Sequence, residues 1–182
     1  DLKDYRNNRC FFYDRIWRRK ASKKNRKNTM SITWNIKKFN QIDANILYSI
    51  LKLRSEVFVL EQKCAYLDID DKDKKATHIF SLDKGDNCIA YGRIFKPNDY
   101  YKSYTAITRI VIRKKDRNKK LGYILVKKLI EFCTEKYTEK TIKISAQKHL
   151  QKFYENCGFL FKGENYLEDG IPHCAMYYSY NL

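Results

Sequence analysis

The sequence predicts a single domain in which helices pack against one mixed α/β sheet. Three observations lead to this fold class. Strand and helix signals alternate from residue 31 onward. The chain of 182 residues is 43% hydrophobic and 15% aromatic, which is enough apolar material for a core. It holds only 6 Gly and 2 Pro, so long linkers and repeat arrays have little to be built from.

The first half of the domain carries the signals of a strand, a helix and a hairpin. Residues 32–36 alternate in polarity, which predicts a strand. Asp43 is a good N-cap for an amphipathic helix that we expect to run to about Val59. After a loop rich in Asp and Lys, residues 77–82 and 88–95 are predicted to form two strands joined by a tight turn.

The second half begins with a longer strand over 105–113, followed by the polar turn 114–120 and a helix from about Lys119 to Tyr137. The remaining predicted elements are a strand over 141–146, a short helix ending near Gly158, and strands over 159–162 and 174–180. The expected order is therefore strand, helix, three strands, helix, strand, helix and two strands.

Basic residues are in excess, and the excess begins at the N-terminus. Residues 1–29 hold eleven Lys or Arg against three Asp, a net charge of +8, within a total of +17. We divide the chain into a basic extension, residues 1–30, and a domain, residues 31–182, because the block over 18–28 is like-charged and lacks hydrophobic periodicity. The extension is interpreted as an appendage or as part of a targeting segment.

The net charge predicts an anionic partner: nucleic acid, an acidic membrane surface or a phosphorylated small molecule. No apolar run approaches the length that crosses a bilayer, so no membrane-spanning segment is predicted, and a membrane is not among the partners that we finally predict. The six cysteines are scattered, without a C-x-x-C pair or the spacing of a zinc site. We therefore expect reduced, mostly buried thiols, no metal and a cytoplasmic location.

Residues 107–123 run from a predicted strand through a basic turn into a helix. The unpaired N–H groups and the positive dipole end at a helix start can hold phosphates, and Arg117, Lys119 and Lys120 add positive charge. Gly122 allows a close backbone approach. The segment predicts a pyrophosphate site, with a solvated helix start as the alternative.

Two motifs resemble the GNAT acyltransferase superfamily. The Arg-x-x-x-x-Gly of 117–122 follows a strand, and Phe-Tyr-Glu-Asn-Cys-Gly-Phe at 153–159 lies about thirty residues further on. In that family the first motif is Arg/Gln-x-x-Gly-x-Gly/Ala and holds the pyrophosphate of acetyl-CoA, while Tyr-x-x-x-Gly-Phe closes the groove. This chain has Lys120 where the middle glycine is usual.

Four further segments narrow the resemblance to the ElaA-like branch of the superfamily. They occur in the same order as in that branch, and the resemblance spans roughly Ile32 to Tyr180, leaving the basic extension outside. The segments are residues 53–64, 68–70, 146–154 and 168–173.

The resemblance implies acetyl-CoA as acyl donor and assigns roles by position. Gln147, seven residues before Tyr154, is a predicted ligand of the pantetheine arm. The backbone of Ile110, Val111 and Ile112 is expected to face the acetyl carbonyl and the same arm. The remaining predicted cofactor-binding residues are Arg117, Asn118, Lys119, Lys120, Leu121, Gly122 and Tyr123.

Tyr154 is at the position of the tyrosine that protonates the departing CoA thiolate, although a core aromatic residue is the alternative. The acceptor ammonium must lose a proton, so a base is also needed. We predict His173 as this base, because it follows a Gly-Ile-Pro turn at a strand start, and Glu61 as the second choice. The other candidates are Asp70, His78, His149, Glu168 and Asp169.

Several charged residues have two interpretations at this point. Arg109 is expected on the strand face opposite Ile110, where a buried ion pair is as plausible as a substrate contact, and Arg54 and Arg93 raise the same question. His78 lies in a strand pattern, so it is either structural or functional.

The predicted function is direct acetyl transfer from acetyl-CoA to the primary amine of a small acceptor. The net charge favours an anionic acceptor, with an amino-sugar phosphate such as glucosamine 6-phosphate first. The alternatives are a protein or peptide lysine or N-terminal acetyltransferase, and a basic nucleic-acid-binding module, the less favoured of these. Pairing of the last strands of two subunits would give a homodimer.

Overall fold

A computed structural model describes residues 32–138 and 141–180, and the predicted basic extension lies outside these residues. The described residues form one seven-stranded sheet in the order β1-β2-β3-β4-β5-β7-β6. Neighbouring strands are antiparallel except β4 and β5, which are parallel. The strands are β1 (Asn35–Lys38), β2 (Thr77–Leu82), β3 (Cys88–Phe95), β4 (Thr105–Ile112), β5 (Thr141–Gln147), β6 (Leu160–Glu168) and β7 (Ile171–Ser179).

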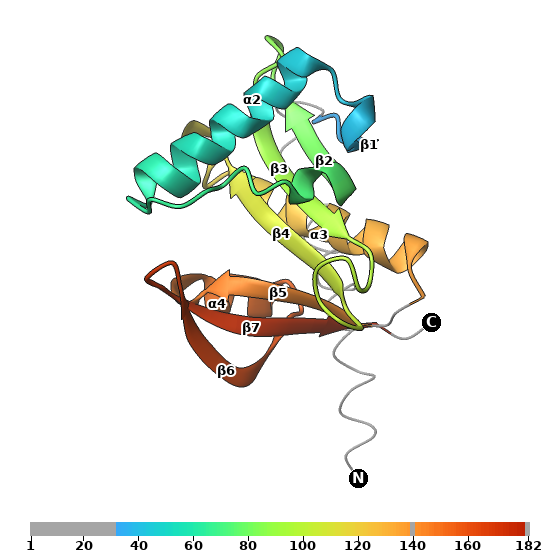
Figure 1. The fold of residues 1–182 in the computed structure, drawn as a ribbon, viewed down its shortest axis with the longest axis vertical. Coiled ribbons are helices and arrows are strands. Elements are labelled where there is room, and N and C mark those ends of the chain that lie inside the picture. The colour runs from blue at the N-terminus through green and yellow to red at the C-terminus, as the bar shows by residue number, and fades with distance from the viewer. Residues whose placement is uncertain (1–31, 139–140, 181–182) are drawn as a thin grey trace, which may run out of the picture. The chain divides into compact units, whose positions relative to one another are not determined.

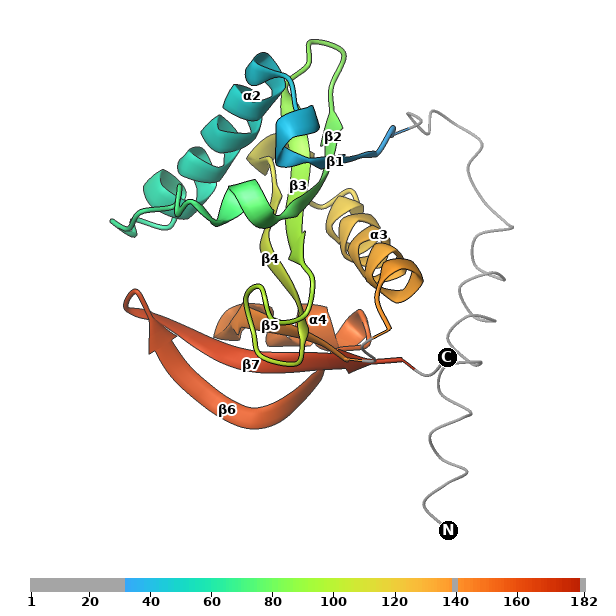
Figure 2. The same ribbon diagram turned by 45° about the vertical axis from the view of Figure 1, so that its right-hand side comes forward.

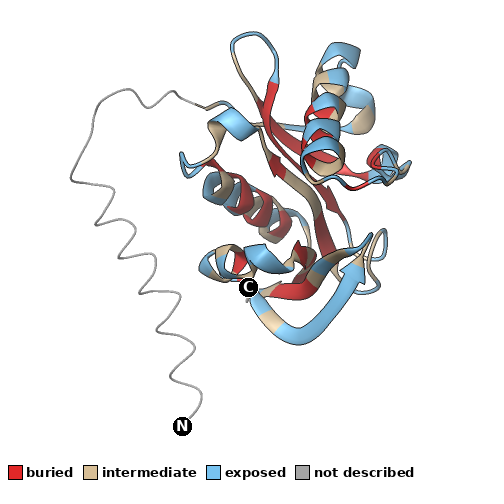
Figure 3. Cartoon of the chain, turned by 90° about the vertical axis from the view of Figure 1, so that its left-hand side faces the viewer, coloured by how far each residue is buried: buried red, intermediate tan, exposed pale blue. Residues whose placement is uncertain are grey.

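Helices cover both faces of the first four strands, α2 (Ala44–Arg54) on one side and α3 (Leu121–Lys136) on the other (Figure 2). Successive residues of a strand point to opposite faces, so Ile79 packs in the core beneath α3 while Phe80 packs in the core beneath α2. A strand covered on both faces is buried along its whole length, as β3 illustrates (Figure 3), and the buried residues of β3 include Arg93 as well as apolar side chains.

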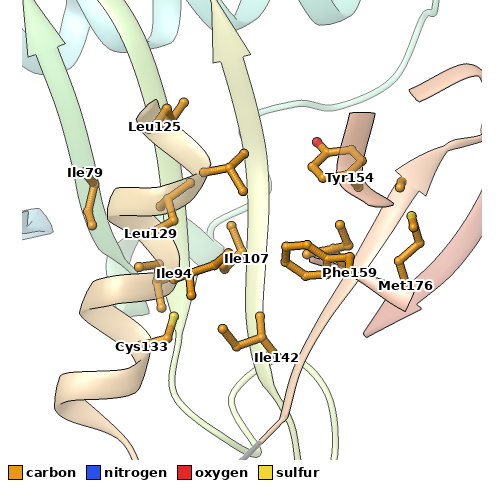
Figure 4. Close-up of a cluster of buried hydrophobic side chains, with 14 of the residues drawn as sticks. Ile79, Ile94, Ile107, Leu125, Leu129, Cys133, Ile142, Tyr154, Phe159 and Met176 are labelled. Carbon is orange, nitrogen blue, oxygen red and sulfur yellow. The ribbon is translucent and has the colours of Figure 1, made fainter. Parts of the chain in front are cut away.

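The larger core joins α3 to the second half of the sheet. Leu125, Leu129 and Cys133 project from α3 toward the strands, and the short helix α4 (Gln151–Asn156) adds Tyr154 to the same cluster (Figure 4). Phe159, which follows α4, fills the space between Tyr154 and β7 and is only 1% exposed. The core therefore fixes α4 against the second half of the sheet.

The structure confirms the predicted mixed sheet and the hairpin strands at the predicted bounds, and it moves several element ends. The first strand begins at Asn35 rather than residue 32. The helix predicted to end near Val59 is α-helical only to Arg54 and continues as a π-helical segment, Ser55–Glu61. β6 extends to Glu168, because an edge strand with mostly exposed side chains has no apolar alternation to reveal it.

Five cysteines lie in the described residues, and all five are free thiols. Four of them are buried and Cys157 is half-buried, while Cys10 lies outside the described residues. Burial raises the pKa of Cys88 and of Cys157 to about 12, so both stay protonated at neutral pH. Within residues 32–138 and 141–180, no helix combines the length and apolar character that crossing a membrane requires.

Candidate active site

A groove of about 850 Å³ opens where β4 and β5 separate. The two strands pair only through Thr105 with Ile142 and Ala106 with Lys143, and beyond these residues they diverge (Figure 1). The second half of β4 therefore has no ladder partner on its β5 side within the described chain. Ile107 to Ile112 line the groove, and on this side their backbone groups have no strand partner. The carbonyl oxygen of Ile112 accepts a hydrogen bond from Arg117 Nε at 3.1 Å. This groove is the location predicted for Ile110, Val111 and Ile112.

A bulge in β4 lies beside this opening. The pairing register of β3 and β4 shifts between Tyr91 and Arg93, so that Thr108 faces Arg93 and Val111 faces Tyr91. Arg109 falls in the shifted part and has a φ of +55°, a left-handed conformation that is rare for a residue with a side chain. Because the bulge interrupts strict alternation, Arg109 and Ile110 both line the groove.

A network of three arginines and three aspartates holds the loop after the π-helical segment against this bulge. Arg109 Nε donates to Asp68 Oδ1 at 2.7 Å. Arg54 Nε donates to Asp68 Oδ2 at 2.8 Å, and its Nη1 donates to Asp73 Oδ1 at 2.7 Å. Of the two interpretations of Arg54 and Arg109, an ion pair or a substrate contact, the structure shows an ion pair for both residues.

Arg93 completes the network and is fully buried. Its guanidinium donates to both carboxylate oxygens of Asp70, at 2.8 and 2.7 Å, and to Asp73 Oδ1 at 2.8 Å. Burial opposes the ionisation of Asp70, but the hydrogen bond and charge of Arg93 outweigh it and lower the pKa of Asp70 well below its usual range. As a predicted base candidate Asp70 is thus a poor proton acceptor, although it lines the groove.

The turn before α3 carries the predicted pyrophosphate residues. Asn118 and Lys120 both have a φ of +62°, so the chain reverses its twist twice before the helix begins. Such turns direct successive N–H groups to one side and form an anion-binding concavity. Leu121 and Gly122 follow at the helix start, and a Cβ on Gly122 would lie 3.4 Å from the ring of Phe153.

The cationic side chains of this turn differ in position. Lys120 lines the groove, whereas Lys119 is outside its lining and pairs with Asp116 at 3.1 Å, so the prediction for the Lys119 side chain has no support from its location. Arg117 lines the groove and donates from Nη1 and Nη2 to the two carboxylate oxygens of Glu61, at 2.6 and 3.1 Å.

Glu61 was predicted as the second-choice base, and its carboxylate is engaged by this bidentate pair. The hydrogen bond from Arg117 lowers the pKa of Glu61 below its ordinary value, despite a small opposing effect of burial. A carboxylate stabilised in this way is a weaker base. The geometry instead makes Glu61 a residue that orients Arg117 across the groove.

Tyr154 lies on α4 with its ring packed in the core and 7% of its surface exposed. It borders the groove, and its hydroxyl is on the side of the ring away from Phe159 (Figure 4). No group in the described ranges hydrogen-bonds to that hydroxyl. Burial raises the pKa of Tyr154, so the phenol keeps its proton at neutral pH and is able to donate it.

His173, on β7, has a fixed tautomer. Its Nδ1 lies 2.8 Å from the carbonyl oxygen of Ile171, which only accepts, so Nδ1 carries the hydrogen of the neutral ring. Nε2 then has the free lone pair, and no group in the described part of the chain pairs with it. Gln147 on β5 and Tyr166 on β6 are its cross-strand neighbours, and both His173 and Gln147 line the groove.

Three of the other predicted bases line the groove, and one does not. His149, Glu168 and Asp169 line the groove. His78 does not: it is 1% exposed, with Nδ1 at 2.8 Å from the hydroxyl of Tyr91 and Nε2 at 2.9 Å from the carbonyl of Asp73. Burial, which outweighs the nearby carbonyl and carboxylate, lowers the pKa of His78 and keeps it neutral, so its role is structural.

Three residues that line the groove, Gln62, Ser145 and Phe153, have no role in the sequence-based prediction. Gln62 accepts a hydrogen bond at 2.9 Å from Nε2 of Gln147, which was predicted to bind pantetheine. Tyr123, a predicted cofactor residue, packs on Phe153 with ring centroids 4.7 Å apart. Ser145 lies two residues before Gln147 on the same face of β5, and this period of two is the signal that could have identified it.

Comparison with known proteins identifies relatives of this chain. A family model described as an acetyltransferase (GNAT) domain matches residues 46–180. Protein ElaA of Escherichia coli K12 is 39% identical over 147 residues, which are 80% of this chain and 95% of that protein. A UPF0039 protein of Synechocystis is 36% identical over 81% of this chain and 95% of its own length.

Solved structures give the same result. The crystal structure of Escherichia coli ElaA has a TM-score of 0.75 and 37% identity, and it covers 81% of this chain and 99% of its own. An acyl-CoA N-acyltransferase from Pseudomonas aeruginosa has a TM-score of 0.74 and 32% identity, with the same coverage. These matches confirm the expected fold and the resemblance to the ElaA-like branch. The chain belongs to the GNAT acetyltransferase family.

Proposed function

We propose that this acetyltransferase uses acetyl-CoA and transfers its acetyl group directly to the primary amine of a small acceptor. The observation that carries the proposal is the convergence of two groups on one groove: the unpaired hydroxyl of Tyr154 and the free Nε2 of His173. They are the acid and the base that amine acylation requires.

The residues around the groove fit a CoA thioester. On the side of β4 that has no strand partner, the backbone of Ile110 to Ile112 offers hydrogen-bonding groups to a pantetheine arm, except for the Ile112 carbonyl, which accepts from Arg117 Nε at 3.1 Å. The amide of Gln147 lies at the same opening. The turn over 117–120 and the start of α3 offer N–H groups to a pyrophosphate, with Arg117 and Lys120 supplying charge. Within the described ranges no cluster of metal-ligating side chains is present.

The chemistry follows from the states of the two side chains. The thioester supplies an activated acyl group. His173 accepts a proton at Nε2 from the acceptor ammonium, which makes the amine nucleophilic. Tyr154, kept protonated by burial, donates its proton to the sulfur that leaves. The nitrogen, which carries one extra proton after its attack, releases that proton as the amide forms, and this proton restores the tyrosine. Alignment in the groove contributes the rest of the rate increase.

The acceptor is proposed from charge. The net charge of +17 favours an anionic amine over a polyamine, so we propose an amino-sugar phosphate, with glucosamine 6-phosphate as the first compound to test. A lysine or N-terminal amine of a peptide is the second candidate. It is favoured by the exposed apolar residues Leu67 and Leu167, which are 77% and 72% exposed; Leu67 borders the groove, and Leu167 directly precedes the groove residue Glu168.

The test measures the rate at which the CoA thiol is released from acetyl-CoA. The acceptors are glucosamine 6-phosphate, glucosamine, spermidine and a lysine peptide. Tyr154→Phe is expected to lower kcat by about 100-fold, because it removes the proton donor while keeping the ring in the core. Tyr48→Phe is the matched control, since Tyr48 is 71% exposed and outside the groove. Failure of the wild type to bind CoA in calorimetry would exclude the proposal.

A further inference from the structure

We propose that Glu168 receives the ammonium group of the acceptor, and that Ser145 and Tyr166 are positioning residues that hold its carboxylate in the groove. The inference rests on the proposed acetyl transfer and assigns a residue to recognition of the amine. It is carried by a chain of two hydrogen bonds, by the charge left on Glu168 and by the position of His173.

The two hydrogen bonds run in one direction. Tyr166 donates its hydroxyl to Ser145 Oγ at 2.6 Å, and Ser145 donates to Glu168 Oε2 at 2.5 Å. A serine has a single proton to donate, so Ser145 is committed to Glu168 while its acceptor capacity is used by Tyr166. Oε2 is thereby fixed, and Oε1 keeps its full capacity to accept hydrogen bonds from a ligand.

The sheet order explains how three separate segments produce this chain. β7 lies between β5 and β6, so Tyr166 on β6 must extend across β7 to reach Ser145 on β5. The residue of β7 opposite Ser145 is Ala175, whose small side chain leaves room for this crossing. Tyr166 also lies nearly parallel to the ring of His173, with 16° between planes and centroids 6.2 Å apart. The positioning chain therefore borders the proposed base.

Glu168 differs from the other carboxylates of the groove in its charge balance. Arg117 neutralises Glu61, and Arg93 neutralises Asp70. In the part of the chain that the structure describes, neither a lysine nor an arginine pairs with Glu168. Its negative charge is available to a cation, and a charge-assisted hydrogen bond from an ammonium to Oε1 would complete its coordination. Neighbouring Asp169 is exposed, and no hydrogen bond within the described chain holds its carboxylate.

The arrangement has a chemical consequence. An amine enters the groove as an ammonium ion, which is the form that a carboxylate binds. One of its protons passes to Nε2 of His173, and the remaining hydrogens keep the nitrogen against Glu168 with its lone pair free. Glu168 thus selects the protonated acceptor, and His173 converts it to the nucleophile.

The first experiment measures binding without turnover. n-Butylammonium chloride is titrated into the protein with CoA present, and backbone amide shifts are followed by NMR, with 1-butanol as the uncharged match. We expect the ammonium ion alone to shift Ser145, Glu168 and His173, and Glu168→Gln to weaken its Kd about tenfold. Glu164→Gln removes the same charge from the same strand outside the groove and is expected to bind like the wild type.

The second experiment separates positioning from general stability. Ser145→Ala and Tyr166→Phe are assayed with each amine of the acceptor panel. They are expected to raise KM for the amine about threefold, because Glu168 loses its fixed orientation, and to leave KM for acetyl-CoA unchanged. Loss of kcat with both KM values unchanged would overturn the positioning role.

The outcomes distinguish this inference from the proposed function. A wild type that binds CoA in calorimetry, but in which n-butylammonium leaves Ser145 and Glu168 unshifted, overturns the role of Glu168 alone. A wild type that does not bind CoA overturns the acetyl transfer on which the inference rests. Equal weakening by Glu168→Gln and Glu164→Gln would show that only the overall charge matters, and would also overturn it.

Discussion

At the scale of single residues, Tyr154 and His173 border the same groove and differ in their hydrogen-bonding surroundings. The ring of Tyr154 is buried, which raises its pKa and preserves a proton for donation. His173 is half-buried and binds a backbone carbonyl through Nδ1, which leaves Nε2 as an acceptor. Tyr154 thus has a hydroxyl proton to offer, and the neutral ring of His173 has its lone pair at Nε2, as the proposed acid and base require.

A substitution of the base tests this assignment. His173→Gln is expected to lower kcat/KM by about 100-fold at neutral pH, since glutamine keeps hydrogen-bonding capacity but does not accept a proton. The loss should shrink as the pH rises, because more of the amine is then already neutral. The measurement is the pH profile of kcat/KM for both proteins.

His149→Gln is the comparison, since His149 also lines the groove but is exposed and makes no hydrogen bond within the described ranges. We expect a change of less than about threefold for this variant. A loss in His149→Gln that matches or exceeds the loss in His173→Gln would assign the base to His149 instead.

At the scale of elements, the bulged strand β4 depends on the buried ion pairs for its shape. Arg109 has a left-handed backbone at the bulge, and its guanidinium is tied to Asp68 on the facing loop. That loop supplies Tyr66 and Leu67 to the groove wall. Buried charges that lose a partner are strongly destabilising, so the network fixes the wall only while every member is paired.

Two substitutions on this loop should differ greatly in stability. Asp73→Asn removes the charge that Arg54 and Arg93 share, and is expected to cost about 3–5 kcal/mol of unfolding free energy. Asp71→Asn removes an exposed pair with Lys74 and is expected to leave the unfolding free energy nearly unchanged, because water screens this pair. Chemical denaturation of the two variants and the wild type measures the difference.

The unfolding free energies of the wild type and Asp73→Asn should also differ in their dependence on pH. Burial opposes ionisation of Asp73, but Arg54 and Arg93 outweigh it and lower its pKa in the folded protein. A carboxyl with a lower folded pKa stabilises the fold above its unfolded pKa of about 3.9, and this contribution is lost as the pH falls below that value. The wild type should therefore lose stability on acidification more steeply than Asp73→Asn. Parallel curves would contradict this account.

At the scale of the whole molecule, the same sheet supports the core and forms the groove, because β4 and β5 diverge in its middle. The strands from β1 to β4 are covered by helices on both faces, while β5, β7 and β6 present the residues proposed to hold and activate the acceptor. The parallel contact between β4 and β5 is confined to two residue pairs. The fold keeps a continuous core and still exposes backbone groups to a ligand.

The basic extension gives a prediction at this scale. A chain lacking residues 1–30 is expected to fold and to bind CoA with unchanged affinity, because every residue proposed to contact CoA lies in the domain over 31–182. Calorimetry with CoA and circular dichroism measure both properties. If the shortened chain unfolds or loses CoA binding, the proposed division is wrong. Binding of duplex DNA by the full chain alone would assign an additional nucleic-acid role to the extension.

The amino-acid sequence by itself determined most elements and the family resemblance, and it predicted Tyr154 and His173 as catalytic residues, both of which line the groove. The turn over 117–122 was predicted from a local pattern of basic residues before a helix, and Tyr154 was predicted from a motif of the family that the sequence resembles. Hairpin strands 77–82 and 88–95 were predicted to the residue, since both are rich in apolar residues and the turn Lys84-Gly85-Asp86-Asn87 lies between them.

Only the tertiary structure decided which charges pair. Glu61 and Arg117 are far apart in the sequence, as are Asp68 and Arg109, and spacing along a chain carries no signal for contacts of this kind. The same holds for the hydrogen bonds from Tyr166 to Ser145 and from Ser145 to Glu168, which exist because β7 brings β5 and β6 to its two sides. Local sequence fixes the period and the ends of an element, whereas long-range packing fixes which side chains meet and therefore which carboxylates remain free to bind a substrate.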